Sequence, residues 1–424
     1  MTHADRAVTS SSRQTHRTGA LRIGFDVSQT AETRAGCGVF QAELFEGLVR
    51  VSAGRDDVTL VPLPVFSHYR HPDFRQAVHV AAPHVDESLY QRSWAELGEA
   101  WDAPGLQAPR LGQVDLVHSN SFGCPRDLGV PLVYTVYDMS PLDHPEFHTE
   151  ANRLVCFQGL FDASTRADAF IAISAFTRAR FLHWFPHVAP EAVAVVHPAA
   201  RAAFQSGQGS RDRDDVLARY GLDRSGFLLA VGTIEPRKNY GLMIDAYQDL
   251  LRRMPDAPPL CIAGQKGWLE GSLDERVRGT AAEARIRPLG FVPDHDLAVL
   301  YHEAAAFLFA SHYEGFGLPL VEALACGATI VAADTSTVAE VVGDAGLLVP
   351  AADPAAMSAA ISRVLADPSS RERRETAARA RAAMFSWDEA ARQTLDIHLR
   401  VAALPATGAT PRRSLPIPDD SPHA

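Results

Sequence analysis

The stretch Glu314-Gly-Phe-Gly-Leu-Pro-Leu-Val-Glu322, followed by Ala-Leu-Ala-Cys-Gly327, is the most informative part of the chain. Proline favours the first position of a helix and glycine the position after its end, so Pro319 and Gly327 predict a helix of about two turns. Glu314 then lies on the loop before the helix, and Glu322 on its first turns. Glycines let backbone amides approach a ligand, and a helix N-terminus accepts an anion. A carboxylate beside an anion site suits a ligand with both hydroxyl and phosphate groups, such as a nucleotide sugar.

This stretch resembles the E-x7-E motif of the retaining glycosyltransferases of family 4, which have the GT-B fold. Two acids, two glycines, a proline and the closing glycine match the motif at fixed spacing. The competing interpretation is a polar loop that caps a core helix. The resemblance covers residues 20 to 402 and implies an α/β protein with two Rossmann-like, doubly wound domains that face each other across a cleft.

Length and composition favour a globular protein with two domains. The chain has 424 residues, of which 46% are hydrophobic, and a formal net charge of −11. This length exceeds a usual single core, and the negative charge argues against general nucleic-acid binding. Five dispersed cysteines show no metal-binding spacing, which fits a reduced compartment. Since no apolar run approaches the ~20 residues of a membrane-spanning helix, we expect a cytoplasmic protein, with peripheral contact at the inner membrane face as an option.

Short apolar runs alternate with helical patterns along the whole chain, as expected for parallel strands covered by helices. The expected strands of the first series are 21–26, 58–63, 115–118, 131–136, 169–173 and 193–196. Those of the second series are 227–231, 260–263, 305–309, 328–332 and 346–349.

The expected organisation has six segments. A disordered tail (1–19) precedes an N-terminal acceptor-side domain (20–203), a solvated linker (204–224) and a C-terminal donor-binding domain (225–386). The family resemblance implies that a helix at 387–402 crosses back to the N-terminal domain, and a second disordered tail (403–424) follows.

A second group of charged residues follows the strand 227–231, in Gly232-Thr-Ile-Glu-Pro-Arg-Lys238. Asn239 is expected to cap the next helix, so Arg237 and Lys238 lie at a strand's carboxyl end, where open α/β sheets bind ligands. Arginine can grip a phosphate with two hydrogen bonds, and lysine adds a point charge. An exposed basic turn is the alternative. Family members place an arginine and a lysine here against the donor diphosphate; some also carry an arginine where this chain has Thr233.

The N-terminal half carries weaker signals. Gly36 and Gly38 resemble the family's glycine-rich loop, which approaches the donor phosphates and the acceptor. A dinucleotide-binding oxidoreductase is disfavoured because the glycines begin well after Asp26 and Gln41 occupies the third glycine position. Tyr137-Asp138 stands where members often show His-Asp. A phenol can hydrogen-bond but cannot act as a base near neutral pH, so Asp138 is the better candidate.

Two further features are interpreted as structural. His144 and His148 could share a helix face, but without a third ligand we interpret them as polar loop residues and not as metal ligands. The helix-like stretch 174–185 is interpreted as partly buried with a basic edge, and a membrane-touching amphipathic helix is its alternative.

The resemblance implies glycosyl transfer from a nucleoside diphosphate sugar to an acceptor hydroxyl group, with retention at the anomeric carbon and without a metal or cofactor. Glu314 would hold sugar hydroxyls, Glu322 the ribose, and Phe291 with Pro293 the base. The expected catalytic residues are Glu314, Arg237, Lys238 and Asp138. The expected substrate-binding residues are Gly36, Gly38, Tyr137, Gly232, Thr233, Phe291, Pro293, Phe316, Gly317, Leu318 and Glu322.

The sequence around Asp138-Met-Ser-Pro and Pro145-Glu-Phe-His148 is similar to mannosyltransferases of surface polysaccharide synthesis. GDP-mannose is therefore the favoured donor, with a glycan, lipid-linked or small-molecule acceptor. The alternatives are a UDP-sugar-dependent transferase of a small acceptor, a hydrolase or phosphorylase, and a non-catalytic nucleotide-sugar-binding subunit.

Overall fold

The computed structural model describes residues 19–30, 36–65, 78–92, 94–103, 107–126, 128–205, 213–224, 226–265 and 278–403. Most of both predicted tails (1–18 and 404–424), the first part of the glycine-rich loop (31–35) and residues 206–212 of the predicted linker lie outside these ranges. Within the described residues, no helix has the length and apolarity needed to cross a bilayer.

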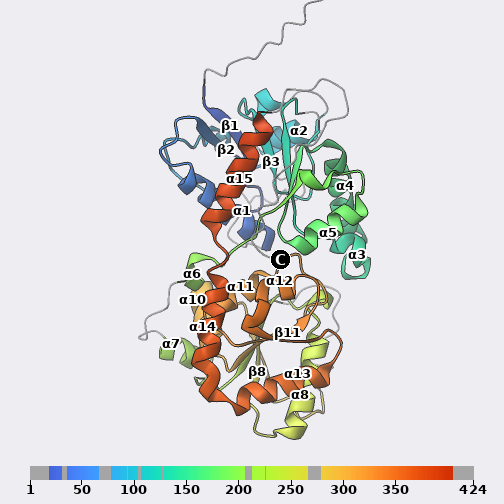
Figure 1. Cartoon of the computed structure of the whole chain (residues 1–424), viewed down its shortest axis with the longest axis vertical. Helices are drawn as coiled ribbons and strands as arrows, with labels where there is room; N and C mark the ends of the chain where they lie inside the picture. Colours follow the sequence, from blue (N-terminus) through green and yellow to red (C-terminus); the bar gives the residue numbers. More distant parts are fainter. Residues whose placement is uncertain are drawn as a thin grey trace, which may run out of the picture.

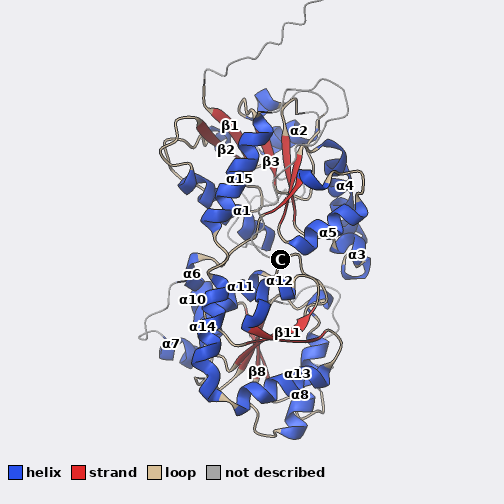
Figure 2. Cartoon of the chain, viewed as in Figure 1, coloured by secondary structure: helices blue, strands red, loops and turns tan. Residues whose placement is uncertain are grey.

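Two six-stranded sheets, each with all strands parallel, form the framework (Figures 1 and 2). The first sheet has the order β2-β1-β3-β4-β5-β6, with β1 Leu21–Asp26, β2 Val58–Leu63, β3 Leu116–Ser119, β4 Leu132–Val136, β5 Ala169–Ala172 and β6 Val193–Val195. The second has the order β12-β11-β10-β7-β8-β9, with β7 Leu228–Val231, β8 Leu260–Ala263, β9 Ile286–Gly290, β10 Ala306–Phe309, β11 Ile330–Asp334 and β12 Gly346–Pro350. The predicted fold class is confirmed.

Helices cover both sheets (Figure 2). Around the first sheet they are α1 Gly36–Val51, α2 Trp94–Asp102, α3 Ser140–Asp143, α4 Glu150–Arg166, α5 Ala175–Trp184 and α15 Trp387–Ala402. Around the second they are α6 Ala202–Gln205, α7 Arg213–Arg219, α8 Tyr240–Arg253, α10 Asp294–Glu303, α11 Leu318–Ala325, α12 Val338–Val342, α13 Pro354–Ala366 and α14 Arg371–Ala382. We call the two groups the N-terminal part and the C-terminal part.

The strand β9 was not predicted from the sequence. It lies at the edge of the second sheet, and most of its residues are exposed. Pro288 interrupts its pattern, and proline is tolerated in sheets mainly on edge strands. The stretch predicted as a solvated linker also differs from the expectation, because it contains α7, where Val216 and Leu217 are buried.

The last helix, α15, returns to the N-terminal part and packs along α1, with contacts to β3, β4 and β5 (Figure 1). Gly47 makes this close packing possible, because a Cβ atom there would lie 3.0 Å from both the Ala391 Cβ and the Trp387 carbonyl oxygen. The domain limits predicted from the sequence remain predictions.

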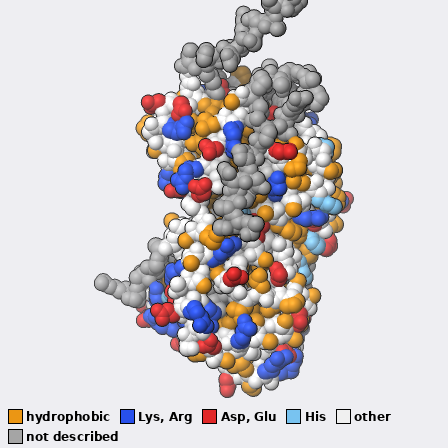
Figure 3. All heavy atoms as spheres, viewed as in Figure 1, with side chains coloured by type: hydrophobic (Ala, Val, Ile, Leu, Met, Phe, Trp, Pro, Cys, Tyr) orange, Lys and Arg blue, Asp and Glu red, His pale blue; other side chains and the backbone are white. Residues whose placement is uncertain are grey.

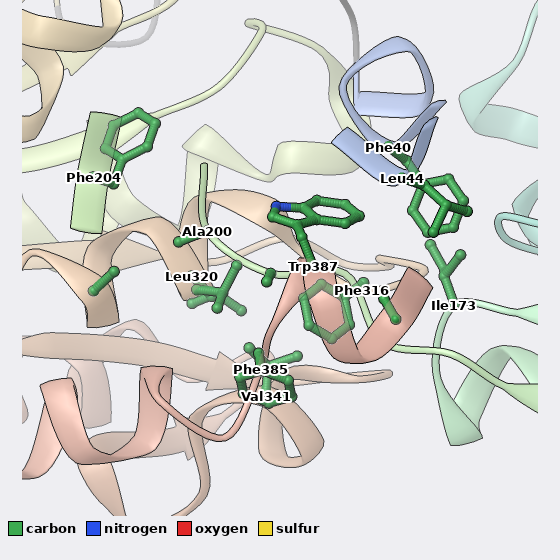
Figure 4. Close-up of a cluster of buried hydrophobic side chains, with 14 of the residues drawn as sticks. Phe40, Leu44, Ile173, Ala200, Phe204, Phe316, Leu320, Val341, Phe385 and Trp387 are labelled. Atoms are coloured by element: carbon green, nitrogen blue, oxygen red, sulfur yellow. The ribbon is translucent and has the colours of Figure 1, made fainter. Parts of the chain in front are cut away.

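One hydrophobic cluster joins the two parts. Figure 4 shows the Trp387 ring among side chains of α1 and of the stretch that begins α11. The Trp387 ring centroid lies 5.8 Å from that of Phe40. The ring centroids of Phe316 and Phe385 lie 5.5 Å apart, and Phe385 stands just before α15 in the chain. The surface differs from this core, since acidic and basic side chains are interspersed over the face seen in Figure 3.

Candidate active site

A group of four charged side chains lies at the carboxyl ends of two neighbouring strands. Arg237 and Lys238 follow β7, and Glu314 follows β10, which pairs with β7. The Glu314 Oε1 lies 2.5 Å from the Lys238 Nζ, and its Oε2 lies 2.7 Å from the Arg237 Nη1. Arg237 also donates through Nη2 to the Glu235 Oε1, at 2.6 Å. The predicted cations therefore lie beside the predicted sugar-binding acid, and the four formal charges cancel.

Burial alone would raise the pKa of Glu314, but the charges of Arg237 and Lys238 outweigh it and lower the pKa to about 2. Burial also lowers the pKa of Lys238, and the charge of Glu314 opposes this effect. Glu314 is 6% exposed, and its backbone N–H donates to the Ser336 Oγ at 3.0 Å. The carboxylate is thus ionised and held by two neighbouring cations of one loop, while Ser336 holds the backbone of the same residue.

The stretch from Pro319 to Gly327 forms the predicted helix, α11, with proline in its first turn. Gly317 is the residue before the helix and has a φ of 91°, which favours glycine. The Leu318 side chain lies 3.9 Å from where a Cβ atom on Gly36 would stand, so the N-termini of α1 and α11 lie side by side. Because N–H groups of a first helical turn lack partners within the helix, two neighbouring helix N-termini favour an anion between them.

Gly315 lies directly against the N-terminal part. A Cβ atom there would be 1.9 Å from the Tyr137 carbonyl oxygen, and the Thr177 hydroxyl group donates to the Gly315 carbonyl oxygen at 3.1 Å. The Tyr137 ring is 8% exposed and packs edge-on against Phe40. Burial raises its pKa well above the usual value. The Tyr137 side chain would have to leave the core before its hydroxyl group could contact a ligand.

Asp138 belongs to a short hydrogen-bond chain. Its Oδ1 accepts from the Ser140 N–H and hydroxyl group, at 2.9 and 2.7 Å, and the His148 Nε2 lies 2.9 Å from the Ser140 Oγ. The Asn152 amide nitrogen, 3.3 Å from the His148 Nδ1, can only donate. Neutral His148 therefore carries its proton on Nε2 and donates to Ser140. Burial lowers its pKa, so this neutral form is favoured.

The two histidines thus differ in their surroundings. His144 pairs with Glu146 and stacks on Phe147, whereas His148 supports Asp138. Among the described residues, no group of three or more His, Cys, Asp or Glu side chains could hold a metal ion.

Glu322, on α11, is 4% exposed and is held by Arg201, which the sequence had not indicated. The Arg201 Nη2 and Nε donate to the Glu322 Oε1 at 2.8 and 3.0 Å. Burial raises the pKa of Glu322 to about 7, although Arg201 acts to lower it. Nearby, Pro293 precedes α10, and Phe291 is 69% exposed.

The remaining residues predicted for the site are glycines, an exposed threonine and a buried phenylalanine, so they would contact a ligand mainly through their backbone. Gly232, at the end of β7, has a φ of 143°, and its carbonyl oxygen accepts from the Tyr240 hydroxyl group at 2.7 Å. Thr233 is exposed beside it, Gly38 is buried in α1, and the Phe316 side chain belongs to the joint core.

The arginine side chains of α5 are hydrogen-bonded to other residues of the protein. Arg178 donates to the carbonyl oxygens of Pro190 and Val193, and Arg180 pairs with Asp143. Phe181 and Phe185 are buried. Membrane contact through this helix stays a prediction.

Two family descriptions match most of the chain. Residues 36–202 match "Glycosyltransferase Family 4", and residues 212–381 match "Glycosyl transferases group 1". O-antigen chain mannosyltransferase B of Escherichia coli is 34% identical, over 67% of this chain and 74% of its own length. D-inositol 3-phosphate glycosyltransferase of Frankia alni is 33% identical, over 74% of this chain and 83% of its own length.

Among solved structures, the Anabaena Alr3699/HepE protein in complex with UDP-glucose has a TM-score of 0.66 at 18% identity. The match covers 91% of this chain and all of the other. At this identity the likeness concerns the fold alone.

Proposed function

Because this chain belongs to family 4 of the glycosyltransferases and has the GT-B fold, we propose that it transfers a hexosyl group from a nucleoside diphosphate sugar to an acceptor hydroxyl group, with retention and without a metal ion. The observation that carries this proposal is the ionised Glu314 between Arg237 and Lys238, next to the paired N-termini of α1 and α11. One carboxylate, two cations and two helix N-termini together fit a sugar that carries a diphosphate.

In this proposal the helix N-termini, Arg237 and Lys238 bind the diphosphate. Negative charge grows on it as the bond between the anomeric carbon and the phosphate oxygen breaks, and preorganised donors stabilise that charge. The acceptor oxygen bonds to the same face of the anomeric carbon, and its proton passes to the leaving phosphate oxygen. Glu314 orients the sugar through its hydroxyl groups. Asp138, which is held through Oδ1 by Ser140, would orient the acceptor through Oδ2 in this proposal.

For the donor we propose GDP-mannose and for the pathway surface polysaccharide synthesis, supported by the similarity to the E. coli mannosyltransferase. A second candidate is a UDP-sugar-dependent transferase of a small acceptor. Its support is the relative named for D-inositol 3-phosphate and the fold neighbour crystallised with UDP-glucose. The cytoplasmic location and a peripheral membrane contact remain predictions.

A panel of UDP-, GDP-, ADP- and TDP-sugars tests the proposal. The true donor at one hundred times its Kd should add about 2.7 kcal/mol to the free energy of unfolding, which a thermal shift detects. Transfer should continue in EDTA, and NMR of the first product should show the anomeric configuration of the donor. Binding without transfer or donor hydrolysis would favour the non-catalytic alternative, and activity restored only by Mg²⁺ or Mn²⁺ would overturn metal independence.

A further inference from the structure

Arg201 lies on the segment that connects the two parts, between β6 and α6. Its guanidinium group stands over the Phe204 ring, 4.9 Å from the centroid, and its side chain is 20% exposed. From this place it reaches two acids of the C-terminal part, Glu322 on α11 and Asp294 at the first position of α10. A residue of the connecting segment thus links two helices that begin near the proposed nucleotide site.

The two bonds to Glu322 both end on Oε1. No described residue donates to Oε2, and in the proposed function this oxygen accepts a hydrogen bond from a ribose hydroxyl group. Asp294 directly follows the Phe291-Val-Pro293 turn, which we expect to meet the base. Arg201 therefore bridges the acid expected at the ribose and the turn expected at the base.

We propose that Arg201 is a positioning residue for the nucleoside: it fixes the ribose-binding carboxylate of Glu322 relative to the base-binding turn. This inference rests on the proposed function, because it takes the ligand to be a ribonucleoside diphosphate. A planar guanidinium group suits the task, since its donors form a rigid fork that lysine cannot reproduce.

The surroundings of Glu322 predict a second measurable effect besides affinity, which is the pH dependence of nucleotide binding. Burial raises its pKa to about 7, and the charge of Arg201 opposes this rise, whereas the charges of Asp294 on α10 and Glu43 on α1 add to it. An ionised carboxylate accepts a stronger hydrogen bond than a protonated one. In the wild type, ribonucleotide binding should weaken as the pH falls through about 7, because Glu322 then becomes protonated. Without Arg201 the pKa of Glu322 rises, so binding should weaken already at higher pH.

The experiment compares the wild type, Arg201→Met and Arg201→Lys by calorimetry with UDP, 2′-deoxy-UDP, GDP, 2′-deoxy-GDP and inorganic pyrophosphate, from pH 6 to 9. In Arg201→Met the preference for the better ribonucleotide over its 2′-deoxy form should shrink about tenfold, and the midpoint of its pH profile should move upward. Pyrophosphate affinity should stay unchanged, because it depends on Arg237 and Lys238. Arg201→Lys should restore the pH midpoint and only part of the preference.

The matched control is Arg219→Met, which removes an arginine from another buried acid, Asp296 on α10. It should alter neither the ribose preference nor the pH profile. If Arg201→Met or Arg201→Lys kept the full preference and the wild-type midpoint, the positioning role would be overturned. If the wild type bound none of these nucleotides and neither ADP nor TDP, the proposed function itself would fail.

Discussion

Glu314 is the side chain on which catalysis should depend most. Its carboxylate lies within hydrogen-bond distance of Arg237 and Lys238, and its low pKa keeps it ionised. Glu314→Gln keeps the shape and removes the charge, so we expect turnover to fall at least about a hundredfold, as a few kcal/mol of transition-state stabilisation are lost.

Affinity for the free nucleoside diphosphate should change little in Glu314→Gln, because that ligand lacks the sugar. A transfer assay and calorimetry on the nucleotide measure the two effects. Glu303→Gln is the control, since it alters another buried, arginine-paired acid on α10. Weaker nucleotide binding with normal turnover in Glu314→Gln would mean that the role assigned to this acid is wrong.

Gly315 should not tolerate even one added methyl group. Its Cβ position lies 1.9 Å from the Tyr137 carbonyl oxygen, and rotation of a side chain cannot relieve a collision with backbone. Gly315→Ala should lower the free energy of unfolding by about 1–3 kcal/mol, the usual cost of overpacking. Urea denaturation measures this. Gly98→Ala, in α2, meets no atom within 4 Å and should be neutral or stabilising. Equal stability of Gly315→Ala and wild type would refute the close contact.

At the scale of elements, α15 is tied to the first sheet by a buried pair of histidines. The His398 Nε2 lies 3.0 Å from the His118 Nδ1, and neither side chain is exposed. Thr135 donates to Asn120, so its oxygen accepts from the His118 Nε2–H. The His118 Nδ1 must then accept from the His398 Nε2–H, so His118 is neutral. The buried His398 Nδ1 has no partner among the described residues, so a neutral His398 is favoured as well.

This pair predicts a pH dependence of stability. Burial lowers the pKa of His398 from 6.5 to about 3 and the pKa of His118 well below its usual value. Below about pH 6.5 the unfolded chain binds protons that the folded one does not, so stability falls with pH until about pH 3, by up to about 1.4 kcal/mol per pH unit for each histidine.

Melting temperatures between pH 8 and pH 5 measure this dependence, and His398→Leu should flatten it. The exposed His183→Gln is the control. A wild-type curve as flat as that of His398→Leu would contradict the assignment of two neutral rings.

The sequence predicted those elements whose signal is local. Apolar runs predicted 11 of the 12 strands found among the described residues, and the pair Pro319 and Gly327 predicted α11. The exposed edge strand β9 has no apolar run. Arg201 could not be predicted from the sequence, because its partner Glu322 is 121 positions away and only folding brings the two together. His148 is a polar loop residue, as predicted, but its link to Asp138 passes through Ser140 and could not be predicted from the sequence.

At the scale of the whole molecule, α5 and α12 meet where the two parts join (Figure 1). Glu340 of α12 accepts from the backbone N–H groups of Ala175 and Phe176, at 2.7 and 3.1 Å, and lies 2.7 Å from the His197 Nε2. Asp143 and Tyr313 add a second contact between the parts, at 2.8 Å.

Glu340→Ala should weaken this junction, because a lost helix cap costs about 0.5–2 kcal/mol. We expect faster hydrogen exchange in the first turn of α5 and a larger radius of gyration by small-angle X-ray scattering. Glu389→Ala, in the first turn of α15, is the control. Unchanged exchange in α5 would show that Glu340 does not hold the junction.

The Glu340 carboxylate acts as an intramolecular ligand, because it occupies an anion-binding helix N-terminus of the same chain. The N-terminus of α5 is an anion receptor, and the carboxylate that fills it is carried by the other half of the molecule. Tethering gives such a ligand an effective concentration in the millimolar range or above. A free anion can replace it only by reaching a comparable concentration or binding more tightly. The contact between the halves at the N-terminus of α5 should therefore weaken as the concentration of small anions rises.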